Sequence, residues 1–174
     1  MLSRKDFVQS AYAHCAEWAE VRRIADELES FLNSAPVARR ITEKNQPGVA
    51  STEIEKIITE KALPLGFQQG QQNLFEHVPN RNLRPDFYIP IGESGILLEV
   101  ERGKTIQNNM DLLDFWKCHI AERAHYLILI VPQHLQQSSS SKPSKPFQAV
   151  VQRLEAFFME QNYTNVRGAV VLGY

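Results

Sequence analysis

Residues 84–105 read RPDFYIPIGESGILLEVERGKT and predict two β-strands joined by a tight turn. The turn is expected at the sequence PIGESG in the middle, because its proline and glycines are typical of a hairpin connection. Side chains alternate between the two faces of a strand, so Glu99 and Glu101 should share one face, opposite to Leu98. Pairing the two strands would also bring Asp86 laterally close to Glu99.

These three acidic side chains need a compensating partner, because like charges on one strand face repel and burying a carboxylate is costly. A hard divalent cation such as Mg²⁺ is one such partner, since it takes oxygen ligands and is usually held by one or two carboxylates with water and phosphate. The alternative is a rim of the sheet where the acids are solvated or paired with Arg84, Arg102 and Lys104. The residues alone leave both interpretations open.

The spacing of the acids resembles that of the PD-(D/E)XK nuclease superfamily, whose members share the restriction-endonuclease-like fold. The matching residues are Pro85-Asp86 and, after a short turn, Glu99-Val100-Glu101. Glu101 stands where a lysine is usual, a variant that some restriction enzymes of this superfamily carry. The resemblance implies an endonuclease that hydrolyses phosphodiester bonds of DNA with Mg²⁺, for which Mn²⁺ would substitute.

With glutamate at position 101, the role of the motif lysine is vacant, and two other lysines are candidates for it. Lys104 lies just past the second strand, and Lys117 lies on the following predicted helix, where some superfamily members carry a displaced lysine. The catalytic residues that the resemblance implies are therefore Asp86, Glu99, Glu101, Lys104 and Lys117.

A helix that precedes the catalytic sheet often lends one further acid to the metal site of this superfamily. Glu55 is the best placed residue for that role in the predicted helix 52–63. Thr52 followed by Glu55 also fits a capping box, in which the glutamate would only cap its own helix. The implied metal ligands are thus Asp86, Glu99, Glu101 and Glu55.

Hydrophobic periodicity along the chain predicts helices that alternate with strands. Helices are expected over residues 6–32, 52–63, 110–120 and 147–161. Strands are expected over residues 73–78, 85–90, 95–102, 126–131 and 166–172. This order predicts an α/β fold with a mixed central sheet flanked by helices. The resemblance implies that it is the restriction-endonuclease-like α/β/α arrangement. We expect the chain to form a single domain overall, with residues 1–50 as an N-terminal helical extension and residues 51–174 as the core. Residues 33–50 are interpreted as a connection with one short helical turn.

The composition of the 174 residues is that of an ordinary globular protein, with 43% hydrophobic and 22% charged residues. Two cysteines are too few for a disulfide framework or a cysteine zinc site, which favours the reducing cytoplasm. No apolar run approaches the roughly 18 residues that a membrane-spanning helix needs, and the N-terminus lacks the apolar core of a signal peptide. We therefore expect a cytoplasmic protein without a membrane partner.

The formal net charge of −1 gives no overall basic field that would attract DNA, although it leaves room for a basic cleft. A homodimer is compatible with a nuclease, since one site cuts one strand and a duplex offers two. The alternative function is a non-catalytic nucleic-acid-binding or assembly module on a degenerate nuclease fold. A nucleotide-binding α/β protein is disfavoured, because no glycine-rich phosphate loop follows a strand.

Overall fold

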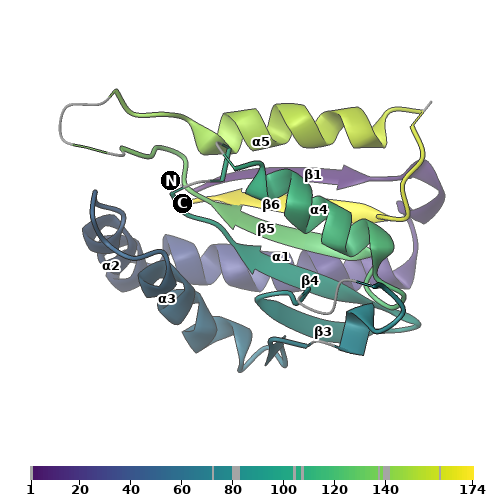
Figure 1. Ribbon diagram of the computed structural model, residues 1–174. Helices are drawn as coiled ribbons and strands as arrows, with labels where there is room; N and C mark the ends of the chain where they lie inside the picture. The colour runs from purple at the N-terminus through teal and green to yellow at the C-terminus, as the bar shows by residue number, and fades with distance from the viewer. Residues whose placement is uncertain are drawn as a thin grey trace.

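The computed structural model describes residues 2–71, 73–79, 83–103, 105–106, 108–136, 138, 142–160 and 162–174. The strands in these ranges form one sheet of six, in the order β1-β6-β5-β4-β3-β2 (Figure 1). They are β1 (Ser3–Val8), β2 (Gln68–Gln69), β3 (Phe87–Ile91), β4 (Ser94–Val100), β5 (Tyr126–Val131) and β6 (Gly168–Gly173). The helices are α1 (Ala16–Asn33), α2 (Ala35–Lys44), α3 (Thr52–Ala62), α4 (Met110–Ile120) and α5 (Pro146–Glu155).

The centre of the sheet is parallel and its two sides are antiparallel. β4, β5 and β6 run parallel, while β1 pairs with β6 and β3 pairs with β4 in the opposite direction. Every residue of β5 is buried, as expected for a continuous apolar strand that is covered on both faces. The sheet is thus mixed, as the order of predicted elements indicated.

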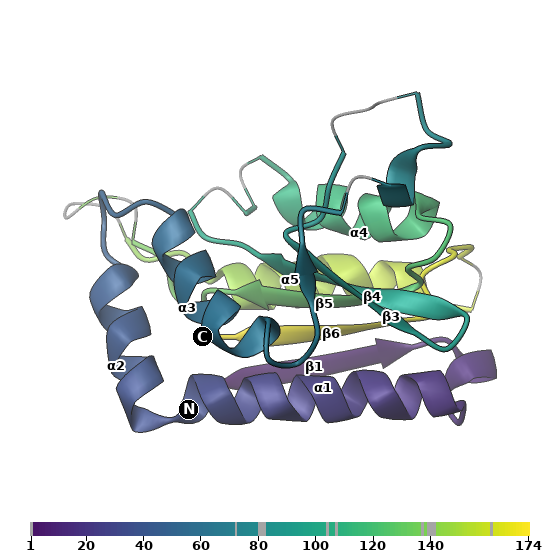
Figure 2. The same ribbon diagram turned by 90° about the horizontal axis from the view of Figure 1, so that it is seen from below.

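Each face of the sheet carries its own hydrophobic core. Leu98 packs with residues of α1, α2 and α3, and Leu97 on the opposite face packs with residues of α4 and α5. Figure 2 shows α1 and α4 on opposite sides of the sheet. Alternation along β4 therefore sends odd-numbered side chains toward α4, which decides where Glu99 lies. None of the helices in the described ranges is both long and apolar enough to cross a membrane.

The helix predicted over residues 6–32 is wrong in its first part. Residues 3–8 are the edge strand β1, paired along its whole length with β6, and a short 3₁₀ turn follows. α1 begins only at Ala16, where Cys15 is the N-cap and its sulfur accepts a hydrogen bond from the Trp18 amide at 3.3 Å. The segment predicted as a purely helical extension thus supplies one strand of the sheet.

Three smaller expectations are also corrected by the structure. The connection predicted over 33–50 contains the ten-residue helix α2. The strand predicted over 73–78 is a 3₁₀ turn over residues 73–75, and the edge of the sheet is instead the two-residue strand β2. The predicted capping box is wrong, because α3 has Ser51 as its N-cap and no side chain caps it.

The burial of β4 on both faces gives a test of this architecture. We expect Leu97→Ala and Leu98→Ala each to lower the free energy of unfolding by about 2–5 kcal/mol, because each removes a fully buried side chain from a different core. Urea unfolding followed by circular dichroism measures both changes.

Leu113→Ala is the matched control, since the Leu113 side chain is 38% exposed on α4 and its truncation should cost under about 1 kcal/mol. A neutral effect at either Leu97 or Leu98 would show that the corresponding face of the sheet is not covered as described.

Candidate active site

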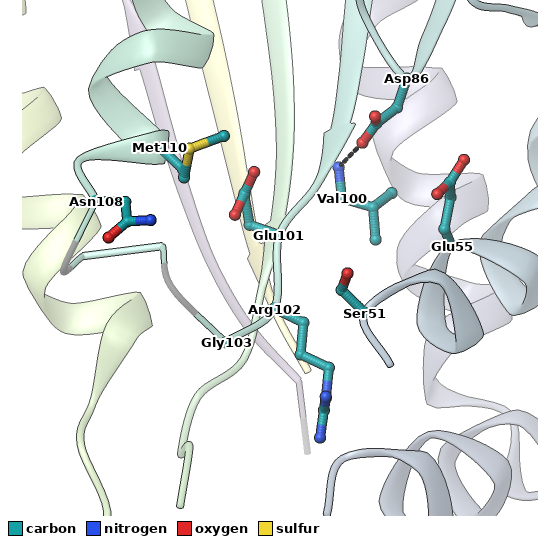
Figure 3. Close-up of a pocket in the computed structure, with 9 residues that line it drawn as sticks. All are labelled: Ser51, Glu55, Asp86, Val100, Glu101, Arg102, Gly103, Asn108 and Met110. Carbon is teal, nitrogen blue, oxygen red and sulfur yellow. Dashed lines mark hydrogen bonds between the residues drawn. The ribbon is translucent and has the colours of Figure 1, made fainter. Parts of the chain in front are cut away.

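A cavity of about 470 Å³ opens beside the end of β4, between the start of α3 and the segment that leads into α4. Three carboxylates line it, from Glu55 on α3, Asp86 before β3 and Glu101 after β4 (Figure 3). Arg102 donates hydrogen bonds to the carbonyl groups of Gln46 and Val49, which fixes the segment that leads into α3. The wall that carries Glu55 is therefore tied to the chain directly after Glu101.

The β3–β4 hairpin sets the position of Asp86. Phe87 pairs with Leu98, so Asp86 lies opposite Glu99, as predicted from the spacing. The amide of Val100 donates to Asp86 Oδ2 at 2.9 Å, and the amide of Asp86 donates to Glu99 Oε2 at 3.2 Å. This exchange holds the two carboxylates side by side at the end of the paired strands.

Glu99 lies beneath the cavity and is only 2% exposed. Its Oε1 atom is 2.7 Å from Lys117 Nζ on α4, and the same ammonium is 2.8 Å from Oδ1 of Asp114. Lys117 Nζ also reaches the carbonyl of Arg84 at 3.5 Å. A buried ammonium thus joins the end of β4 to α4 and to the segment before β3.

Glu101 continues the chain beyond β4 on the same side as Glu99. Its amide donates to the carbonyl of Ile130 at 2.8 Å, and its Oε2 accepts a hydrogen bond from the Thr105 hydroxyl at 3.4 Å. Burial and the neighbouring Asp114 carboxylate raise the pKa of Glu101 to about 8. One proton held between Glu101 and Asp114 is therefore more favourable than two ionised carboxylates side by side.

The other acids of the site are also shifted toward their protonated forms. Burial raises the pKa of Asp114 to about 6, and burial together with Asp114 raises the pKa of Glu99 well above its ordinary value. The pKa of Asp86 is raised by burial, against the opposing effect of the Val100 amide. Among the described residues, Lys117 is the cation in direct contact with these acids. Burial lowers the pKa of Lys117, but the Glu99 and Asp114 carboxylates outweigh this effect and raise it.

The donor atoms fit a hard divalent cation. Asp86, Glu101 and Glu55 offer carboxylate oxygens to the cavity, and negative charge at the site exceeds what Lys117 neutralises. As they lie, the described side chains include no group of three histidines, cysteines or acids poised around one metal position. Both oxygens of Glu99 already have partners, since Lys117 Nζ contacts Oε1 and the Asp86 amide donates to Oε2, so Glu99 would join such a group by giving up one of these contacts.

The structure brings together most of the residues predicted for the site. Asp86, Glu99 and Glu101 lie at the end of the hairpin, Lys117 contacts Glu99, and Glu55 lines the cavity. Lys104 lies outside the described residues. Arg102, an alternative partner for the acids, binds backbone carbonyl groups instead.

Sequence reasoning missed Asp114, which is 1% exposed and pairs with Lys117. A signal was available, since Asp114 precedes Lys117 by three positions and both should lie on one face of a helix. Asp114 was not singled out, because charged side chains on helices are usually exposed. The contact depends on α4 turning this charged face toward β4, which the local pattern does not specify.

Comparison with known proteins supports the architecture. No protein-family model matches the chain, and no curated protein matches its sequence. A crystal structure of the restriction endonuclease BglII in complex with a DNA 16-mer aligns over 99% of this chain and 77% of that chain, with a TM-score of 0.53 and 13% sequence identity. The chain has a restriction-endonuclease-like fold. This confirms the predicted fold class, while the glutamate variant of the nuclease motif stays a prediction.

The raised pKa of Glu101 predicts how stability depends on pH. Glu101 titrates near 4.5 in the unfolded chain and near 8 in the folded one, so the folded state binds more protons between these values. Its contribution to stability is therefore present below pH 4.5 and is lost as the pH rises through 8. We expect the free energy of unfolding of Glu101→Gln, relative to that of the wild type, to increase as the pH rises from 5 to 8.

Urea unfolding of metal-free protein at several pH values measures this difference. Glu53→Gln is the control, because the half-buried Glu53 lies outside the site and hydrogen bonds from Lys56 and Lys44 lower its pKa, which moves its titration away from this range. Parallel stability curves for the wild type and Glu101→Gln would contradict the raised pKa.

Proposed function

We propose that this protein is a Mg²⁺-dependent endonuclease that hydrolyses phosphodiester bonds of DNA. One observation carries the proposal: Asp86, Glu99 and Glu101 converge with Lys117 beside an open cavity at the end of the β3–β4 hairpin. The restriction-endonuclease-like fold and the DNA in the BglII structure support it. A solvated rim does not account for these acids, because Glu99 and Asp114 are buried around one buried ammonium.

In this proposal, Asp86 and Glu101 present oxygen ligands to the cation, and Glu99 joins them when its carboxylate leaves Lys117. Bound Mg²⁺ supplies a Lewis acid for the phosphate and a water of lowered pKa. Mn²⁺ is expected to substitute, since it takes the same carboxylate and water ligands.

The remaining groups have roles that follow from their positions. Glu101 reaches into the cavity. Once ionised, it is placed to orient an attacking water or to accept a proton from that water. The Lys117 ammonium supplies positive charge close to the reacting phosphate, the part that a motif lysine plays in this superfamily. Glu55 on the facing wall is a further candidate ligand. We expect two copies to act together on duplex DNA, since one site cuts one strand.

The pairing of Glu99 with Lys117 also favours a second candidate function. An internal ammonium that neutralises the acids makes a cation unnecessary for folding, as in a non-catalytic nucleic-acid-binding or assembly module. Under this alternative, the buried charges would hold β4 to α4 and would serve no chemistry.

Cleavage of supercoiled plasmid and of single-stranded DNA with Mg²⁺ or Mn²⁺ tests the proposal. We expect Asp86→Asn, Glu99→Gln and Glu101→Gln each to lower the rate by about 100-fold or more, because each removes a ligand or a proton acceptor from the reacting centre.

Glu53→Gln should cleave like the wild type, since Glu53 pairs with Lys44 and Lys56 on the surface. Full activity in the three site variants would refute the site assignment. A wild type that neither cleaves nor binds a divalent cation in calorimetry would favour the non-catalytic module.

A further inference from the structure

Helix α4 buries three charged side chains beside the apolar Phe115 and Cys118, and it leaves two large apolar side chains exposed. Asp111, Asp114 and Lys117 are buried, while Leu113 is 38% and Trp116 is 41% exposed. The usual arrangement of a helix on a sheet is the reverse. Replacing buried ion pairs with apolar residues is often neutral or stabilising, so packing alone does not account for this face. The part of it that faces β4 adjoins the proposed site.

Asp114 and Lys117 share one face of α4, because they are three residues apart on the same helix. The Lys117 ammonium contacts Oδ1 of Asp114 at 2.8 Å and Oε1 of Glu99 at 2.7 Å. The Asp114 carboxylate is buried and also lies beside Glu101. Among the described residues, Lys117 is the cation that Asp114 contacts. Glu99 belongs to a different element and has a second partner in the Asp86 amide.

A cation that binds Glu99 through Oε1 competes with Lys117, and one that binds through Oε2 competes with the Asp86 amide and is repelled by the nearby ammonium. If Glu99 were the sole carboxylate partner of Lys117, releasing it would leave a buried ammonium without a counter-ion, which is strongly unfavourable. Asp114 removes that obstacle, because the ammonium keeps one carboxylate when Glu99 turns away.

We propose that Asp114 is a positioning residue that anchors the Lys117 ammonium on α4, so that Glu99 is free to bind a divalent cation. This inference rests on the proposed function and assigns Asp114 no direct contact with cation or DNA. It predicts a specific dependence between positions: loss of Asp114 weakens cation binding only while Lys117 is present to claim Glu99.

A double-mutant cycle on the full chain tests this dependence. The probe is Mn²⁺, and its dissociation constant is measured by calorimetry and as the concentration that half-saturates cleavage. We expect Asp114→Asn to weaken Mn²⁺ binding by roughly 10- to 100-fold, the range for groups that orient a metal ligand. In a Lys117→Gln background, the same substitution should no longer weaken Mn²⁺ binding, because no ammonium is left to claim Glu99.

Asp111→Asn is the matched control, because Asp111 is also buried on α4 and pairs with Arg153 at 3.0 Å outside the site. It should leave the Mn²⁺ dissociation constant at the wild-type value, whatever it does to stability. Should Lys117→Gln not fold, Glu99→Gln replaces it in the cycle with calorimetry as the readout, and Asp114→Asn should again not weaken Mn²⁺ binding in that background.

The outcomes separate this inference from the proposed function. Equal weakening by Asp114→Asn with and without Lys117 would make Asp114 a direct electrostatic contributor and overturn the anchoring role. A wild-type affinity in Asp114→Asn would overturn it as well, and in both cases the nuclease proposal would stand. A wild type that neither binds Mn²⁺ nor cleaves DNA would overturn both.

Discussion

The buried Lys117 ammonium is the interaction on which the arrangement around the candidate site depends. Glu99 and Asp114 are almost fully removed from water, and each lies within 3 Å of Lys117 Nζ. Carboxylates in such surroundings are tolerated only with a close cation or a bound proton. Lys117 meets part of this need, and burial together with neighbouring carboxylates raises the pKa values of Glu101 and Asp114, so that these acids favour their protonated forms. A divalent cation at the cavity would favour their ionised forms instead.

Topology explains how the charges are brought together. The β3–β4 hairpin places Asp86 beside Glu99, and the crossover from β4 through α4 to β5 lays α4 across the face that carries odd-numbered β4 residues. From this position on α4, the Lys117 side chain reaches Glu99 near the end of β4. β3 and β4 belong to the sheet and α4 packs on it, so the site rests on buried elements. Arg102 holds the segment that leads into α3, which forms the facing wall of the cavity.

The sequence predicted those features that depend on local patterns. Alternation and turn chemistry were enough for the hairpin and for the pairing of Asp86 with Glu99, and apolar periodicity was enough for α3, α4 and β5. β1 was missed because its place in the sheet comes from pairing with β6 at the far end of the chain. Asp114 was missed because its burial depends on which face of α4 meets the sheet. These are long-range consequences that spacing does not encode.

A crystal structure of the protein grown with Mn²⁺ would test the central claim most directly. An anomalous difference map identifies Mn²⁺ without reference to activity. We expect a peak in the cavity between the carboxylates of Asp86 and Glu101, with Lys117 still in contact with Asp114. A map with no peak there, from crystals whose Glu99 remains paired with Lys117 at saturating Mn²⁺, would contradict it and favour a module whose buried charges serve only the fold.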